Sequence, residues 1–133
     1  MKYMVIGYLV LASGCAEQSL QDSQTDNGRA LFAQHCAACH GTGGRGDGAL
    51  APQLPVAPAD LTLLSRSAGG QFPRDSVMTQ IYGYPGRFHR GLMPEFGPVL
   101  EGPMIDYERA DGTTVQTPKA LVAIARHLEN IQR

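Results

Sequence analysis

The stretch HCAACHG, residues 35–41, decides how this sequence of 133 residues is interpreted. It places two cysteines three residues apart, with a histidine directly after the second. This spacing is compatible with a thiol redox pair, with half of a zinc site, or with the attachment point of a c-type haem. These possibilities need different compartments and different companion residues, so the rest of the sequence can distinguish them.

Companion residues favour the haem interpretation. A structural zinc site needs four ligands, usually as two close pairs, and the sequence has only one close cysteine pair. A thioredoxin-like pair follows a strand, whereas here a helical pattern precedes the cysteines. A haem uses the whole motif, because each thiol can bond to one vinyl group of the porphyrin while the histidine binds the iron. We therefore predict a covalent haem c at Cys36 and Cys39, with His40 as an axial ligand.

The N-terminal residues indicate export. Lys2 precedes an apolar run over residues 4–12, which is long enough for a signal-peptide core and too short to span a bilayer. Cys15 follows in the sequence LASGC, which resembles the lipobox of bacterial lipoproteins, where the cysteine is acylated. We predict a signal peptide over residues 1–14 and a lipid anchor at Cys15, on the periplasmic side of a bacterial cell envelope. An ordinary cleaved signal with an unused cysteine is the alternative.

Composition excludes some classes of partner. Eleven Lys and Arg residues stand against twelve Asp and Glu, so no basic excess suggests a nucleic-acid partner. Sixteen glycines and nine prolines indicate long loops and a small core that a cofactor could stabilise. The length allows one domain. We assign residues 15–25 to a polar tether after the signal peptide and residues 26–133 to the domain.

Helical patterns occupy both ends of this domain. We expect a first helix that Thr25 or Asp26 caps, with Leu31 and Phe32 facing inward, and a loop over residues 41–67. A helix over residues 74–82 has an apolar stripe of Val77, Met78 and Ile81. The last helix is expected to have Thr117 as its N-cap and Pro118 at its first position. Its apolar face comprises Leu121, Ile124, Ala125, Leu128 and Ile131.

The region before the last helix predicts a small β-hairpin. Asp111 and Gly112 stand between two short extended runs, which is typical of a two-residue turn. Apart from this possible hairpin, no set of strands could form a sheet. The fold class predicted from the pattern is all-α, with short helices joined by long loops.

The sequence resembles a bacterial class I cytochrome c over about residues 28–128. The resemblance rests on Gly28 and Phe32, on CAACH, on the stretches GRGDG and PADLT, and on the stretch GLMPEF at residues 91–96. It implies a small all-α fold around one haem c, with His40 and Met93 as axial ligands. It also implies that the first and last helices cross near Gly28 and Phe32.

The sequence departs from this family in two places. His127 stands on the last helix where the family usually has an aromatic residue, so the helix crossing could be packed differently. Residues 99–116 form an insertion between the methionine loop and the last helix. This insertion could cover the haem edge or offer a surface to a partner.

Other residues could replace Met93 as the second axial ligand. His89 lies four residues before it and would produce a bis-histidine centre of low potential. Met78 falls on an apolar helical stripe, and Met104 lies in the insertion. His35 precedes the first cysteine, and its side chain is expected to point away from the iron.

With both axial positions filled, the iron would have no open site for a substrate. We therefore expect a one-electron carrier, not an enzyme, that docks with redox partner proteins. Arg87 and Arg90 flank His89 and could contact an acidic partner or a haem propionate. The alternatives are a haem subunit of a larger dehydrogenase or oxidase complex, and a sensor or enzyme with a displaceable ligand.

Overall fold

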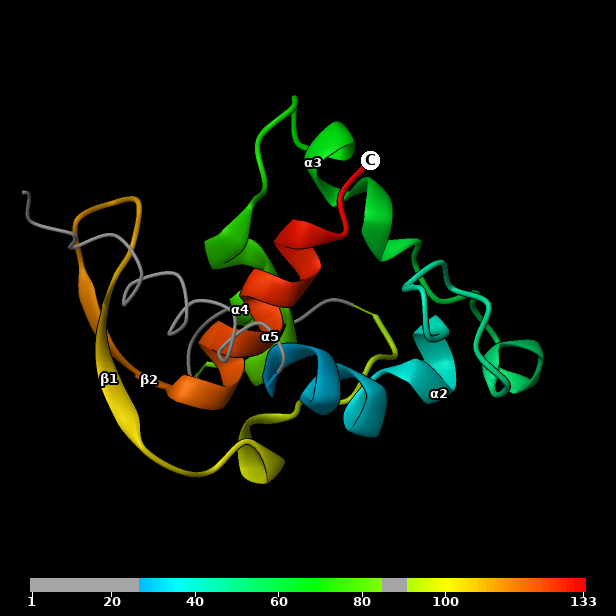
Figure 1. Ribbon diagram of the computed structural model, residues 1–133, viewed down its shortest axis with the longest axis horizontal. Coiled ribbons are helices and arrows are strands. Elements are labelled where there is room, and N and C mark those ends of the chain that lie inside the picture. Colours follow the sequence, from blue (N-terminus) through cyan, green and yellow to red (C-terminus); the bar gives the residue numbers. More distant parts are fainter. Residues whose placement is uncertain (1–26, 85–90) are drawn as a thin grey trace, which may run out of the picture.

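The computed structural model describes residues 27–84 and 91–133. Residues 27–35 are helical, and the helices after them are α2 (Ala37–His40), α3 (Leu64–Ser67), α4 (Arg74–Tyr82) and α5 (Lys119–Asn130). Three short 3₁₀ helices are η1 (Ala51–Gln53), η2 (Leu61–Leu63) and η3 (Gly97–Val99). Strands β1 (Met104–Glu108) and β2 (Thr114–Pro118) pair antiparallel. In Figure 1, α4 and α5 lie centrally, between α2 on one side and the hairpin on the other.

The helix over residues 27–35 crosses α5 at Gly28. A Cβ atom built on Gly28 would lie only 2.1 Å from the carbonyl oxygen of Ala123, so any side chain would force the helices apart. Phe32 lies one turn further along and is only 1% exposed. Its ring centroid is 5.2 Å from that of His127. The expected crossing is present, and the His127 ring packs at a tilt against Phe32, where the family usually has another aromatic residue.

The central pair of helices follows the predicted apolar patterns. Helix α4 has the predicted bounds and buries Val77, Met78 and Ile81. Helix α5 is buried around most of its circumference, because residues outside the predicted stripe are also covered. Its buried residues are Leu121, Val122, Ala123, Ile124, Ala125, His127 and Leu128.

The start of α5 differs from the prediction. Thr117 and Pro118 belong to β2, where they pair with Ile105 and Met104, and Pro118 is the residue that precedes the helix. The Thr117 hydroxyl is 2.9 Å from the Tyr84 hydroxyl and does not cap the helix. The prediction of Thr117 as N-cap is wrong because strand pairing continues through Pro118, the residue directly before α5.

The hairpin turn also differs from the prediction. The amide of Arg109 donates to the carbonyl of Thr113, and the amide of Gly112 donates to the carbonyl of Arg109. The turn therefore has three residues, 110–112, instead of two. Gly112 has a φ of 80°, a left-handed conformation that favours glycine at the last position of such a turn.

The loop after α2 is more ordered than predicted, since η1, η2 and α3 interrupt residues 41–67. Asp60 caps η2 by accepting a hydrogen bond from the amide of Thr62 at 2.9 Å. The predicted caps of the first helix, Thr25 and Asp26, lie outside the described residues, as do the signal peptide and Cys15. Among residues 27–84 and 91–133, no helix is long and apolar enough to cross a bilayer.

The buried His127 predicts a dependence of stability on pH. Burial, and then the positive charge of Arg29, lower the pKa of His127 below its ordinary value of 6.5. A histidine that is harder to protonate in the fold than in the unfolded chain costs stability in acid. The contribution is complete above pH 6.5 and is lost as the pH falls from there through the lower pKa of the folded state.

We therefore expect His127→Phe to flatten the fall in unfolding free energy below pH 6.5, because phenylalanine keeps the ring contact with Phe32 without a titrating group. Denaturant unfolding of wild type and variant between pH 5 and 8 measures this. Parallel curves for the two proteins would contradict the prediction.

Candidate haem-binding site

The two cysteines and the histidine of the opening stretch lie on one helical turn. The amide of Cys36 donates to the carbonyl of Phe32 at 2.9 Å, and the amide of His40 donates to the carbonyl of Cys36 at 2.9 Å. Residues three and four apart on such a turn share a face. Cys36, Cys39 and His40 therefore project from the same side of the turn, and both thiols are free.

The imidazole of His40 is held in one tautomer. Its Nδ1 lies 3.0 Å from the carbonyl oxygen of Ala59, nineteen residues further along the chain. A carbonyl only accepts hydrogen bonds, so Nδ1 must carry the proton. The lone pair of Nε2 is then available to a metal, and the bond to Ala59 fixes the orientation of the ring.

The loop after α2 packs closely against that helix. The amides of Gly46, Gly48 and Leu50 donate to the carbonyls of His40, Cys39 and Ala38 respectively, at 2.8, 3.1 and 2.9 Å. These bonds satisfy carbonyls at the end of α2 that would otherwise lack partners. A Cβ atom on Gly48 would lie 2.4 Å from the carbonyl oxygen of Ala38, so only glycine permits this approach.

The two thiols have different surroundings. Cys36 is only 8% exposed and belongs to the apolar core, whereas Cys39 is half-buried. Burial, and then the charge of Cys39, raise the pKa of Cys36 to about 11. Cys36 is therefore a neutral thiol at physiological pH, which is compatible with its position in the apolar core.

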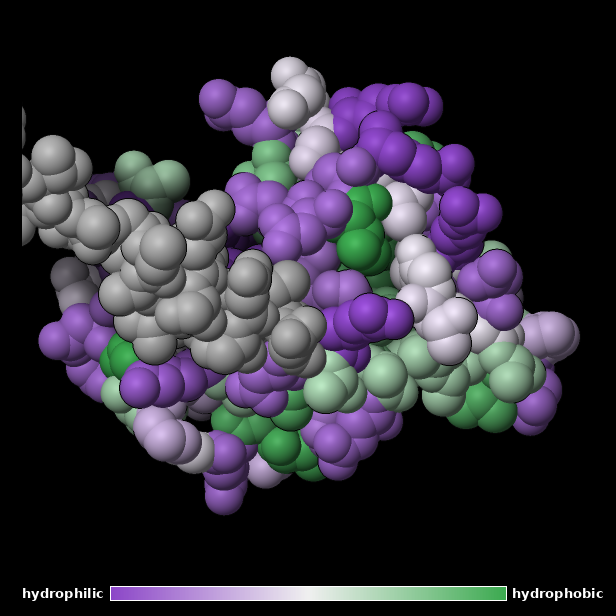
Figure 2. All heavy atoms as spheres, viewed as in Figure 1, coloured by the Kyte–Doolittle hydropathy of each residue, from purple (hydrophilic) through white to green (hydrophobic). Residues whose placement is uncertain are grey.

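Large apolar side chains are exposed in the loop that follows this turn and directly before Met93. Leu50, Leu54 and Val56 follow α2, and Leu92 directly precedes Met93; Val56 and Leu92 are 66% and 68% exposed. Figure 2 shows apolar residues at the lower right, over the loop that follows α2 in Figure 1. Exposed apolar groups around a set of donor atoms are typical of a site for an apolar ligand. The residues present therefore fit a haem c.

Met93 packs against the same core as Cys36. It is half-buried, and the chain after it is fixed to α4 because the amide of Phe96 donates to the carbonyl of Ile81 at 2.8 Å. In the view of Figure 1, this segment runs between α4 and α2. Met93 is thus joined to the core that contains one of the two cysteines.

The other candidate ligands have different positions. Met78 is buried on α4 within the core, as expected of a packing residue, and Met104 is exposed on β1. His35 is half-buried at the end of the first helix. His89 and its neighbours Arg87 and Arg90 lie outside the described residues.

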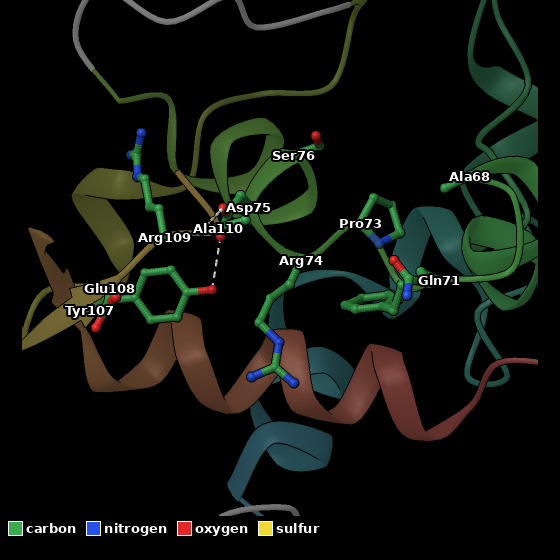
Figure 3. A pocket seen from close by; sticks show the side chains of 11 residues that line it. Ala68, Gln71, Pro73, Arg74, Asp75, Ser76, Tyr107, Glu108, Arg109 and Ala110 are labelled. Atoms are coloured by element: carbon green, nitrogen blue, oxygen red, sulfur yellow. Dashed lines mark hydrogen bonds between the residues drawn. The ribbon is translucent and has the colours of Figure 1, made fainter. Parts of the chain in front are cut away.

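A cleft of about 840 Å³ lies elsewhere, between the hairpin and the start of α4 (Figure 3). None of the predicted site residues lines it. Asp75 accepts hydrogen bonds at 2.8 Å from both the Tyr107 hydroxyl and the Ala110 amide. Burial, and then the bond to Asp75, raise the pKa of Tyr107 to about 12, so it remains a donor. These bonds dock the hairpin on α4.

Sequence reasoning missed two features of the site. The Ala59 carbonyl left no signal, because every residue has a carbonyl group and its side chain plays no part. The bonds between Asp60 and Thr62 could have been found, since Asp two residues before Thr is a common local capping pattern. Asp60 accepts from the Thr62 hydroxyl at 2.6 Å as well as from its amide.

One family model matches the chain, over residues 23–110, and it is described as cytochrome c oxidase, cbb3-type, subunit III. The match includes Cys36, Cys39, His40 and Met93, and it covers well over half of the chain. No curated protein and no solved structure matches the sequence. The haem-binding motif, the helix crossing and this match agree: the chain belongs to the cbb3-type subunit III family and is a haem-binding electron-transfer cytochrome of class I.

Proposed function

We propose that the protein is a one-electron carrier of the bacterial cell envelope with one haem c. In this proposal Cys36 and Cys39 form the thioether bonds, and His40 and Met93 are the axial ligands. The observation that carries it is the geometry of His40, whose Nδ1–H is committed to Ala59 while Nε2 is left for iron. The same helical turn presents both thiols.

Haem, when bound, supplies an iron that gains and loses one electron at a time. The chain's own residues would fix both axial positions and keep water from the iron. As a ligand, the thioether of Met93 would favour the ferrous state relative to a second imidazole and would so raise the potential. With His40 and Met93 both bound to it, the iron would have no open position for a substrate, which favours a carrier role.

The family description supports a second candidate, a haem subunit within an oxidase complex. Exposed Leu50, Val56 and Leu92 would suit either role, because apolar side chains around a haem site can contact a redox partner. The two candidates can be distinguished by purifying the protein twice, once without added detergent and once from intact membranes, and by testing whether other subunits accompany it. A stable complex with other subunits would favour the second candidate over an independent carrier.

We expect Cys36→Ser with Cys39→Ser to abolish covalent haem attachment, because no sulfur remains to bond to the vinyl groups. A denaturing gel stained for haem peroxidase activity measures this. The matched control, Cys15→Ser, should keep the stained band. Staining of the double variant at the wild-type level would disprove thioether bonds at these residues.

We expect Met93→Ala to keep the covalent haem but to lower the midpoint potential, since the soft sulfur that favours Fe(II) is gone. The reduced variant should bind carbon monoxide readily, and reduced wild type should not. His89→Ala is the matched control and should behave as wild type. The opposite pattern would assign the ligand to His89, and rapid binding by wild type would favour a sensor or enzyme.

We propose that Cys15 carries a lipid anchor, because it ends the lipobox-like stretch LASGC. Two or more acyl chains would hold the protein firmly on a membrane. Cys15→Ser should move the protein from the membrane to the soluble periplasmic fraction, as immunoblots of the separated fractions would show. Ser19→Ala, in the same tether, should stay with the membrane. Wild-type protein found only in the soluble fraction would rule out the anchor.

A further inference from the structure

Gln132, just after α5, ties three parts of the chain together. Its Nε2 donates to the carbonyls of Leu61 and Leu128, at 2.7 Å each. Its Oε1 accepts from the amide of Ser65 at 2.8 Å. Both ends of one side-chain amide are therefore committed to backbone groups, which fixes η2 and α3 against the end of α5.

Arg133 holds the same segment from a second direction. Its Nε donates to the Thr62 hydroxyl at 2.7 Å, its guanidinium pairs with Asp60 at 2.9 Å, and its amide donates to the carbonyl of Thr62 at 3.1 Å. Thr62 is only 4% exposed. The hydroxyl of Thr62 and then Arg133 lower the pKa of Asp60, so the carboxylate is charged at neutral pH.

This segment begins one residue after the acceptor of the His40 proton. Ala59, whose carbonyl accepts from His40 Nδ1, directly precedes Asp60. On its other side the segment is fixed by the amide of Leu61, which donates to the carbonyl of Gly44 at 2.7 Å. Figure 1 shows the chain beyond α5 close to α3, in agreement with these contacts. A continuous set of bonds therefore joins the end of α5 to the imidazole.

We propose that Gln132 and Arg133 are positioning residues for the axial histidine. By holding residues 60–62, they keep the Ala59 carbonyl on Nδ1 of His40. The inference rests on the proposed role of His40 as an iron ligand. A firm Nδ1–H bond makes the imidazole a more basic ligand and stabilises the ferric state, so loosening it should raise the midpoint potential.

The test uses the full-length protein with its haem and compares Gln132→Met and Arg133→Met with wild type. Gln116→Met, on the exposed face of the hairpin, and Arg66→Met, at an exposed position of α3, are the matched controls. The readouts are the solvent-exchange rate of the His40 Nδ1 proton, followed by NMR with ¹⁵N-labelled histidine, and the midpoint potential. Thermal unfolding is recorded in parallel.

We expect exchange of the His40 Nδ1 proton to be about tenfold faster in both variants, because the Ala59 carbonyl is no longer held in place. The potential of Gln132→Met should rise, and that variant carries no change of charge. Arg133→Met also removes a positive charge, which by itself lowers the potential. Its potential should therefore exceed that of Arg66→Met, which loses the same charge. Arg133→Lys, which can still pair with Asp60, should recover slow exchange.

Two outcomes would overturn the inference in distinguishable ways. If the wild-type haem shows no histidine ligand from His40, the proposed function fails and the inference fails with it. If wild type is normal, but both variants unfold at lower temperature with unchanged proton exchange and potential, only the inference fails. Gln132 and Arg133 would then stabilise the fold without acting on His40.

Discussion

The contact between the backbones of Gly28 and Ala123 is the constraint on which the rest of the structure depends. Because Gly28 has no side chain, the helix over residues 27–35 lies directly against α5, and Phe32 reaches the ring of His127. Cys36 follows one turn after Phe32 and is hydrogen-bonded to it, so the crossing fixes where the α2 turn begins. The same crossing fixes α5, whose far end carries the residues that bond to the segment after Ala59.

Periodic apolar patterns predicted the parts of the fold that pack as helices. The bounds of α4 and the buried stripe of Val77, Met78 and Ile81 were correct, because burial along a helix leaves a repeat in the sequence. The inward face of α5 was correct except for Ile131, which follows the helix and is only partly buried. The start of α5 and the length of the hairpin turn were wrong. Both depend on how far two strands stay paired, and no local residue pattern determines that.

The site was predictable to the extent that it is local. Spacing alone places Cys36, Cys39 and His40 on one face of a turn, because a helix of any origin brings residues three and four apart together. Met93 came from the resemblance, since its relation to the turn depends on packing across the whole domain. The acceptor of the His40 proton could not be predicted, because Ala59 contributes only its backbone. The hairpin supports α4 from the side away from α2 (Figure 1). Tyr107, within the 99–116 insertion, donates to Asp75 of α4 (Figure 3), and Thr117, just after the insertion, bonds to Tyr84 beyond the end of α4.

The helix crossing also has a consequence for the order in which the chain folds. Gly28 and Ala123 lie near opposite ends of the domain, so their contact closes a very long loop, and such closure is slow compared with the formation of local structure. The hairpin forms from neighbouring residues, and once docked on α4 it brings the start of α5 next to α4 before the first helix arrives. We therefore expect the α4, hairpin and α5 unit to assemble early, and the helix that leads into Cys36 to dock on it last.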